Sequence, residues 1–327
     1  MPTIPERILG HTKQQAELLQ DIATSNVSHA YLFTGPAHIG KSTVARWFAV
    51  ELLASLPGAD KAAIRTQVER LIHSDFVSLD LLWVEGVSED WSEIGSYSNV
   101  QQRHRSKAPT AKTDAIGIDD VRGVIEQMHG TSQSPFRICL VTDIERMHGE
   151  AANALLKIIE EPPPRVVFLL TSADPRAVLP TITSRTRMLH FHRLSNEMMA
   201  SFVPETHQDD AALLLQLSRG APGTLLRYMN DAELFRQTKT VHARARAFWK
   251  SNSLQERLSL CMPAQESREA SEEFLTHLGI TLAGIDSIAA RASWTEQYTM
   301  LSQALQTNTN RGLALSAFTL AVSEKTW

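Results

Sequence analysis

Cysteine is almost absent from this chain of 327 residues, and that scarcity excludes several kinds of site. The two cysteines, Cys139 and Cys261, lie far apart, so we expect neither a disulfide framework nor a cysteine-based zinc site. No apolar run approaches the roughly 20 residues that span a bilayer, so no membrane contact is expected. The first residues show no basic-plus-apolar signal layout, and a cytoplasmic protein is therefore the default expectation.

A basic excess is also missing. The formal net charge is -4, whereas a chain that grips nucleic acid by itself usually carries a positive excess. Any contact with DNA is therefore expected to be shared with partners. A hydrophobic fraction of 43% is enough for sizeable cores, and the length indicates two or three domains.

The strongest motif that is present is a phosphate-binding loop. The pattern G-x-x-x-x-G-K-[ST] is matched by Gly35, Gly40, Lys41 and Ser42. Residues 30–34 before it are typical of a buried strand, and a helix is expected from Thr43 to Leu53, which is the context that this loop needs. Lys41 would reach the β- and γ-phosphates of a nucleotide, and the Ser42 hydroxyl would bind Mg²⁺. The alternative is a glycine-rich turn that binds nothing.

Strand and helix patterns alternate up to about Leu194, which predicts a parallel, doubly wound α/β sheet flanked by helices. Strands are expected over 30–34, 81–84, 136–143, 166–170 and 187–192. Helices are expected over 14–23, 61–72, 118–128 (with Asp119 as cap) and 149–159, a short helix or turn over 177–185, and a solvated loop over 89–113. Beyond residue 194 only helical patterns continue. The predicted domains are 1–193, 194–238 and 239–327.

Asp143 ends a predicted strand, where a carboxylate can hold Mg²⁺ together with the hydroxyl of the phosphate loop. A merely solvating Asp is the alternative. Hydrolysis also needs a residue that orients water, usually a Glu directly after this Asp, and here Ile144 stands in that place. Glu145 lies one residue too far to be assumed as its substitute and fits the following helix equally well. Intrinsic ATPase activity is therefore expected to be weak or absent.

Three longer segments resemble the bacterial clamp-loader AAA+ subunits of DNA polymerase III. They are Ala151-Ala-Asn-Ala-Leu-Leu-Lys-Ile-Ile-Glu-Glu-Pro-Pro, Phe168-Leu-Leu-Thr-Ser-Ala-Asp-Pro and Leu179-Pro-Thr-Ile-Thr-Ser-Arg. Shorter similar segments begin at His73, Ile116, Ser218 and Asn310. The resemblance implies an AAA+ P-loop nucleotide-binding domain, a small helical lid and a C-terminal all-helical collar that serves oligomerisation.

The resemblance also implies roles that spacing alone does not give. Arg185 would be an arginine finger directed at ATP bound by a neighbouring subunit, with Ser184 positioning the turn. An ordinary surface salt bridge is the alternative for Arg185. Thr171 and Ser172 would be the first sensor of the γ-phosphate, unless Thr171 only caps a turn, and Arg227 falls near the second sensor. With Thr43 in the loop, the expected ligand is ATP or ADP with Mg²⁺.

Partners follow from the same resemblance. They would be gamma/tau and delta subunits in a hetero-pentameric ring, and through that ring the β-clamp and primed DNA. Related chains carry a four-cysteine zinc module, but residues 54–73 contain no cysteine, so we expect a helical replacement and no zinc. An autonomous gamma/tau-like ATPase motor is the competing interpretation. A small-molecule kinase would explain neither the helical third of the chain nor Ser184-Arg185.

Overall fold

The computed structural model describes residues 4–5, 8, 10–107, 113–129, 132–285, 287–307 and 310–324. The chain divides into two compact units. The first comprises Met1–Pro204 with Arg219–Thr224, and the second comprises Glu205–Ser218 with Leu225–Trp327. This division does not test the three-domain prediction, whose boundaries at residues 193 and 238 stay predictions.

The first unit is built on a five-stranded, wholly parallel sheet in the order β2-β3-β4-β1-β5. Its strands are β1 (Ala30–Thr34), β2 (Phe76–Leu79), β3 (Arg137–Val141), β4 (Val166–Ser172) and β5 (Arg187–His190). Its helices are α1 (Thr12–Ala23), α2 (Lys41–Leu53), α3 (Lys61–Glu69), α4 (Trp91–Ile94), α5 (Arg103–Lys107), α6 (Ile118–Met128), α7 (Gly149–Glu160), α8 (Pro180–Thr183) and α9 (Asn196–Ala200). The predicted α/β fold class is confirmed.

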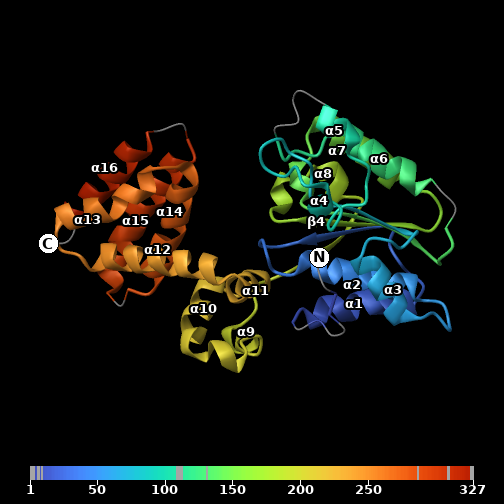
Figure 1. Cartoon of the computed structure of the whole chain (residues 1–327), viewed down its shortest axis with the longest axis horizontal. Helices are drawn as coiled ribbons and strands as arrows, with labels where there is room; N and C mark the ends of the chain where they lie inside the picture. The colour runs from blue at the N-terminus through green and yellow to red at the C-terminus, as the bar shows by residue number, and fades with distance from the viewer. Residues whose placement is uncertain are drawn as a thin grey trace. The chain divides into compact units, whose positions relative to one another are not determined.

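Both faces of the sheet are covered by helices, which is why β1 to β4 are buried along their whole length and mostly apolar. Successive strand side chains alternate between the faces. In β1, Leu32 packs in a core with α6 and α7, whereas Tyr31 and Phe33 pack in a second core with α1 and α2. Figure 1 shows these helices as two layers with the sheet between them.

Two local predictions were wrong. The strand expected over 81–84 is instead β2, Phe76–Leu79, which pairs with β3 from Phe76 opposite Ile138. Both segments are apolar, and only the pairing with a distant strand separates them. Asp119 does not cap α6. The cap residue is Gly117, whose backbone N–H donates to the carboxylate of Asp120 in the first turn at 2.8 Å, while Asp119 pairs with Arg122.

The segment expected to be a solvated loop over 89–113 is also more ordered than predicted. It contains α4 and α5, and residues 108–112 lie outside the described part. Arg105 is buried there, with its guanidinium 2.6 Å from the Asp120 carboxylate. A polar composition concealed this pairing, because its partner is 15 residues further along the chain.

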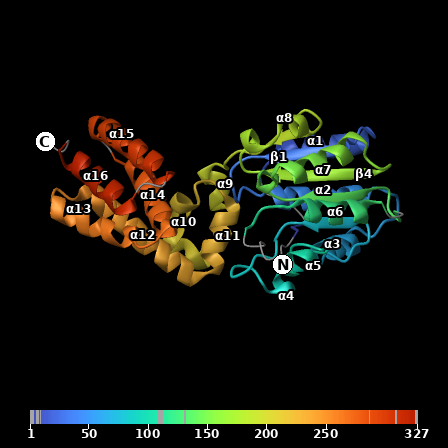
Figure 2. The same cartoon turned by 90° about the horizontal axis from the view of Figure 1, so that it is seen from above.

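The second unit is helical. After α10 (Ala211–Ser218) and α11 (Pro222–Asn230), which begins in the first unit, come α12 (Ala232–Lys250), α13 (Leu254–Cys261), α14 (Arg268–Ala283), α15 (Ile288–Leu305) and α16 (Arg311–Glu324). Figure 2 shows α12 to α16 gathered as a bundle. Its core is rich in stacked aromatic rings, among them Trp249 on Trp294 and Phe248 on Phe318. Among the described residues, no helix combines the length and apolarity that crossing a bilayer requires.

Candidate functional site

The predicted phosphate loop connects β1 to α2. Two glycines shape it for different reasons. Gly35 has φ +148°, and a Cβ there would lie 2.3 Å from the carbonyl oxygen of Phe191, so only glycine fits. Gly40 has φ +100° with open space around it, so its backbone conformation alone favours glycine. Glycine is therefore favoured at both positions by the backbone of this loop.

Lys41 begins α2 and turns back into the loop. Its ammonium donates to the carbonyl oxygens of Gly35 at 2.7 Å and Pro36 at 2.8 Å. The residue is buried, and this burial lowers the pKa of Lys41, although the charges of Asp143 and Glu145 partly oppose the shift. A desolvated cation at the centre of a glycine-bounded loop is suited to an anionic ligand.

Asp143 lies at the end of β3 in a left-handed conformation, with φ +50°. Its backbone N–H donates to the Thr171 hydroxyl at 3.0 Å, which joins the ends of β3 and β4. Partial burial of the carboxyl raises the pKa of Asp143, and the charge of Glu145 raises it further. The structure thus brings Lys41, Asp143 and Thr171 to one edge of the sheet.

The sequence left open whether Glu145 joins the site or lies on the following helix. It lies in a 3₁₀ turn, Ile144–Arg146, rather than on α7. One carboxylate oxygen accepts the backbone N–H of Ala173 at 2.7 Å, just past β4. The left-handed Asp143 redirects the chain so that Glu145 returns to the same edge of the sheet. Spacing alone did not reveal this, because the turn depends on one backbone angle.

The remaining predicted ligands are also near this edge. Ser42 and Thr43 occupy the half-buried first turn of α2. Ser172 is buried, its hydroxyl has no hydrogen-bond partner among the described residues, and its carbonyl accepts the N–H of Gly35 at 3.2 Å. A hydroxyl and a carboxylate are the hard oxygen ligands that Mg²⁺ prefers, so Ser42 and Asp143 fit a nucleotide-bound Mg²⁺.

Two further contacts to backbone carbonyls of the phosphate loop were not predicted from the sequence. The N–H of Gly223, in the first turn of α11, donates to the carbonyl of His38 at 2.9 Å. The His11 ring lies 3.0 Å from the carbonyl of Ile39 and packs on Phe191. Arg227, the predicted second sensor, is exposed on α11 in the other unit, and its nucleotide contact stays a prediction.

Arg185 follows α8, and its side chain is 41% exposed. It forms an ion pair with Glu160 at 2.9 Å and donates to the carbonyl of Thr181 and the hydroxyl of Ser184. The interactions found for Arg185 within the described residues are therefore with α7, α8 and the residue after α8. The hydroxyl of Ser184 in turn donates to Thr181, which fixes this turn.

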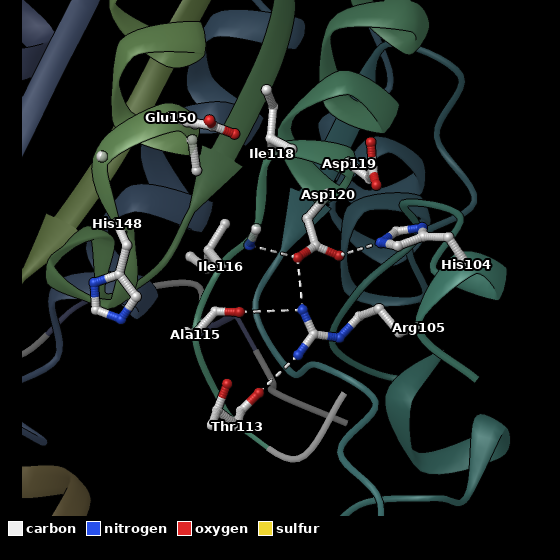
Figure 3. Close-up of a pocket in the computed structure, with 13 residues that line it drawn as sticks. His104, Arg105, Thr113, Ala115, Ile116, Ile118, Asp119, Asp120, His148 and Glu150 are labelled. Carbon is white, nitrogen blue, oxygen red and sulfur yellow. Dashed lines mark hydrogen bonds and ion pairs between the residues drawn. The ribbon is translucent and has the colours of Figure 1, made fainter. Parts of the chain in front are cut away.

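A separate pocket of about 460 Å³ lies where α6 and α7 begin. Figure 3 shows the Asp120 carboxylate held between Arg105 and His104, with His148 across the pocket. Arg105 also donates to the carbonyls of Trp83, Ala115 and Thr113. This internal network keeps the segment before α6 in place, and no residue of the phosphate loop lines the pocket.

Comparison with known proteins places these features in context. Residues 10–195 match the family model described as DNA polymerase III, delta subunit. A DNA polymerase III subunit delta' of Pseudomonas aeruginosa is 31% identical over 65% of this chain and 60% of that protein. A gamma/tau subunit of Mycobacterium tuberculosis is 26% identical over 68% of this chain. The chain thus spans 36% of this gamma/tau relative's length and 60% of the delta' relative's.

Among solved structures, a gamma subunit-related protein of Thermotoga maritima superposes with a TM-score of 0.48 at 18% identity, covering 94% of this chain and 99% of that one.

Proposed function

This chain belongs to the DNA polymerase III delta subunit family of clamp-loader proteins, and from that premise we propose that it is a delta-prime subunit. In this function it supports ATP-driven loading of the sliding β-clamp on primed DNA. Its catalytic contribution is an arginine, Arg185, given to the ATP site of a neighbouring gamma/tau subunit. The identity to a subunit delta', at 31%, exceeds the 26% to gamma/tau and supports this choice.

The single observation that carries the proposal is the placement of Arg185. Its side chain is exposed, and its ion pair with Glu160 is a surface pair, which contributes only about 0–1 kcal/mol. Breaking the ion pair with Glu160 so that the guanidinium can bind a phosphate therefore costs little free energy. A guanidinium is planar, permanently charged and able to bind two phosphate oxygens at once, which suits a finger that stabilises the transition state of phosphoryl transfer.

The residues of the subunit's own loop fit a nucleotide. Lys41 would contact the β- and γ-phosphates, and Ser42 and Asp143 would hold Mg²⁺, with Thr43, Thr171 and Ser172 completing the pocket. The Mg²⁺ would neutralise phosphate charge when bound. The residue after Asp143 is Ile144, which supports a subunit that binds nucleotide and contributes little hydrolysis of its own.

Partners follow from the same proposal. Residues 239–327 would be the collar through which the chain joins gamma/tau and delta subunits in a hetero-pentameric ring. A net charge of -4 supports a subunit that meets DNA as part of the assembled ring rather than alone.

The experiment is Arg185→Ala in a clamp loader reconstituted with gamma/tau and delta. Ring assembly should stay intact, and ATP turnover stimulated by primed DNA should fall. Arg176→Ala is the matched control, since Arg176 is also an exposed arginine, 89% accessible, that pairs with a nearby carboxylate. Turnover that is equal in the two variants would rule out the finger.

An autonomous gamma/tau-like ATPase motor is the second candidate. It is favoured by the intact loop and by Glu145, whose carboxylate returns to the edge of the sheet beside Ala173. ATP turnover by the isolated chain separates the two functions. Steady turnover that Lys41→Ala abolishes would favour the motor over the finger-donating subunit.

A further inference from the structure

Asp80 directly follows β2. It is a charged residue that has no place among the predicted nucleotide ligands. It ends the segment that begins His73-Ser-Asp-Phe, and its side chain is 26% exposed. One carboxylate oxygen accepts the Thr142 hydroxyl at 2.7 Å. The other lies 3.3 Å from a guanidinium nitrogen of Arg46. Asp80 thus connects the residue before Asp143 to helix α2.

Arg46 is the residue of α2 that contacts Asp80. It lies four residues after Ser42 on α2, so both side chains leave the same face of the helix. Its side chain is only 2% exposed, and its Nε and Nη1 atoms have no hydrogen-bond partner among the described residues. Asp80 is therefore the main compensation for a buried cation placed one helical turn behind the expected Mg²⁺ ligand.

Arg146 also stabilises the residues that follow β2 and β3. It donates to the backbone carbonyl of Asp80 at 2.7 Å and to that of Thr142 at 3.2 Å. Asp143 is thereby fixed through the residue before it, while its own N–H is held by Thr171. A left-handed aspartate needs such restraint, since this conformation is costly for residues other than glycine.

We propose that Asp80 and Arg46 are positioning residues for the Mg²⁺ ligands, with the Thr142 hydroxyl transmitting their position to Asp143. This inference rests on the proposed nucleotide binding. Asp80 holds Thr142, Arg46 holds Asp80 against α2, and the spacing between Ser42 on α2 and Asp143 after β3 is set by this chain of contacts. In this role both residues act through Thr142 and Asp143 rather than by contact with the nucleotide.

The test is the affinity for fluorescent mant-ADP, measured with Mg²⁺ and with EDTA, on the full chain. Thr142→Val removes the hydroxyl and keeps both the shape of the residue and the Arg46–Asp80 pair. The affinity gained from Mg²⁺ should fall about five-fold, the change expected for one lost hydrogen bond. The affinity in EDTA should stay within about two-fold. Asp80→Asn keeps an acceptor for Thr142 but removes the charge that pairs with Arg46, so the Mg²⁺ gain should fall in this variant as well.

Asp119→Asn is the matched control, because Asp119 is an exposed carboxylate whose partner, Arg122, takes no part in this chain of contacts. An unchanged Mg²⁺ gain in Thr142→Val, or an equal loss with Mg²⁺ and with EDTA, would overturn the positioning role and leave nucleotide binding standing. No binding of mant-ADP by the wild-type chain under either condition would instead overturn the nucleotide-binding function and, with it, this inference.

Discussion

Replacing Gly35 by alanine should destabilise the first unit more than the same replacement at Gly40 or Gly58. All three glycines have positive φ, at +148°, +100° and +83°. This conformation costs a residue with a side chain about 1–3 kcal/mol. Only at Gly35 does the new Cβ meet backbone, 2.3 Å from the Phe191 carbonyl, and overpacking of this kind adds about 1–3 kcal/mol.

The expected losses are therefore about 2–6 kcal/mol for Gly35→Ala and about 1–3 kcal/mol for the other two variants. Hydrogen exchange of β1 and β5 peptides measures this loss in the first unit alone. Gly58 lies in the segment between α2 and α3, away from the phosphate loop. Gly40→Ala and Gly58→Ala should be similarly stable, and only Gly40→Ala should weaken mant-ADP binding. Equal exchange in Gly35→Ala and Gly58→Ala would refute the role of the Phe191 contact.

Three further predictions concern other parts of the chain. Burial, reinforced by nearby His242 and Arg244, lowers the pKa of His277 to about 4. As the pH falls, His277 therefore takes up a proton in the unfolded chain before it does so in the folded one. The free energy of unfolding of the second unit should drop by up to about 3 kcal/mol between about pH 6.5 and 4. A denaturation midpoint that stays constant over this range would disprove the prediction. Asp75→Ala should lower the free energy of unfolding by about 3–5 kcal/mol, because Asp75 is fully buried and pairs with Arg137. In thermal unfolding, a loss as small as that of the exposed Asp119→Ala would contradict a stabilising role for the buried pair. Purified protein should contain no stoichiometric zinc by elemental analysis.

The parts of the fold that depend on neighbouring residues were predictable from the sequence. The phosphate loop is defined by a short spacing and by the strand and helix beside it, and the structure places it between β1 and α2 as expected. The place of Asp143 near the end of a strand was predictable for the same reason, since it comes two residues after the apolar run 138–141. Such signals need no knowledge of which distant segments pair.

The parts that depend on distant pairing were not predictable. The position of β2 is decided by its register with β3, since both segments, 76–79 and 81–84, are mostly apolar. The return of Glu145 to the site depends on one left-handed residue. The link from Arg46 to Thr142 through Asp80 joins three elements that no sequence spacing relates.

The measurement that tests the central claim most directly compares two variants of this subunit in the reconstituted clamp loader. The readout is ATP turnover stimulated by primed DNA. Arg185→Ala should lower turnover to the level that the unaffected sites sustain, while Lys41→Ala should leave it close to wild type, because the subunit gives an arginine rather than hydrolysing its own ATP. Loss of turnover with Lys41→Ala and none with Arg185→Ala would contradict the account and favour a motor subunit.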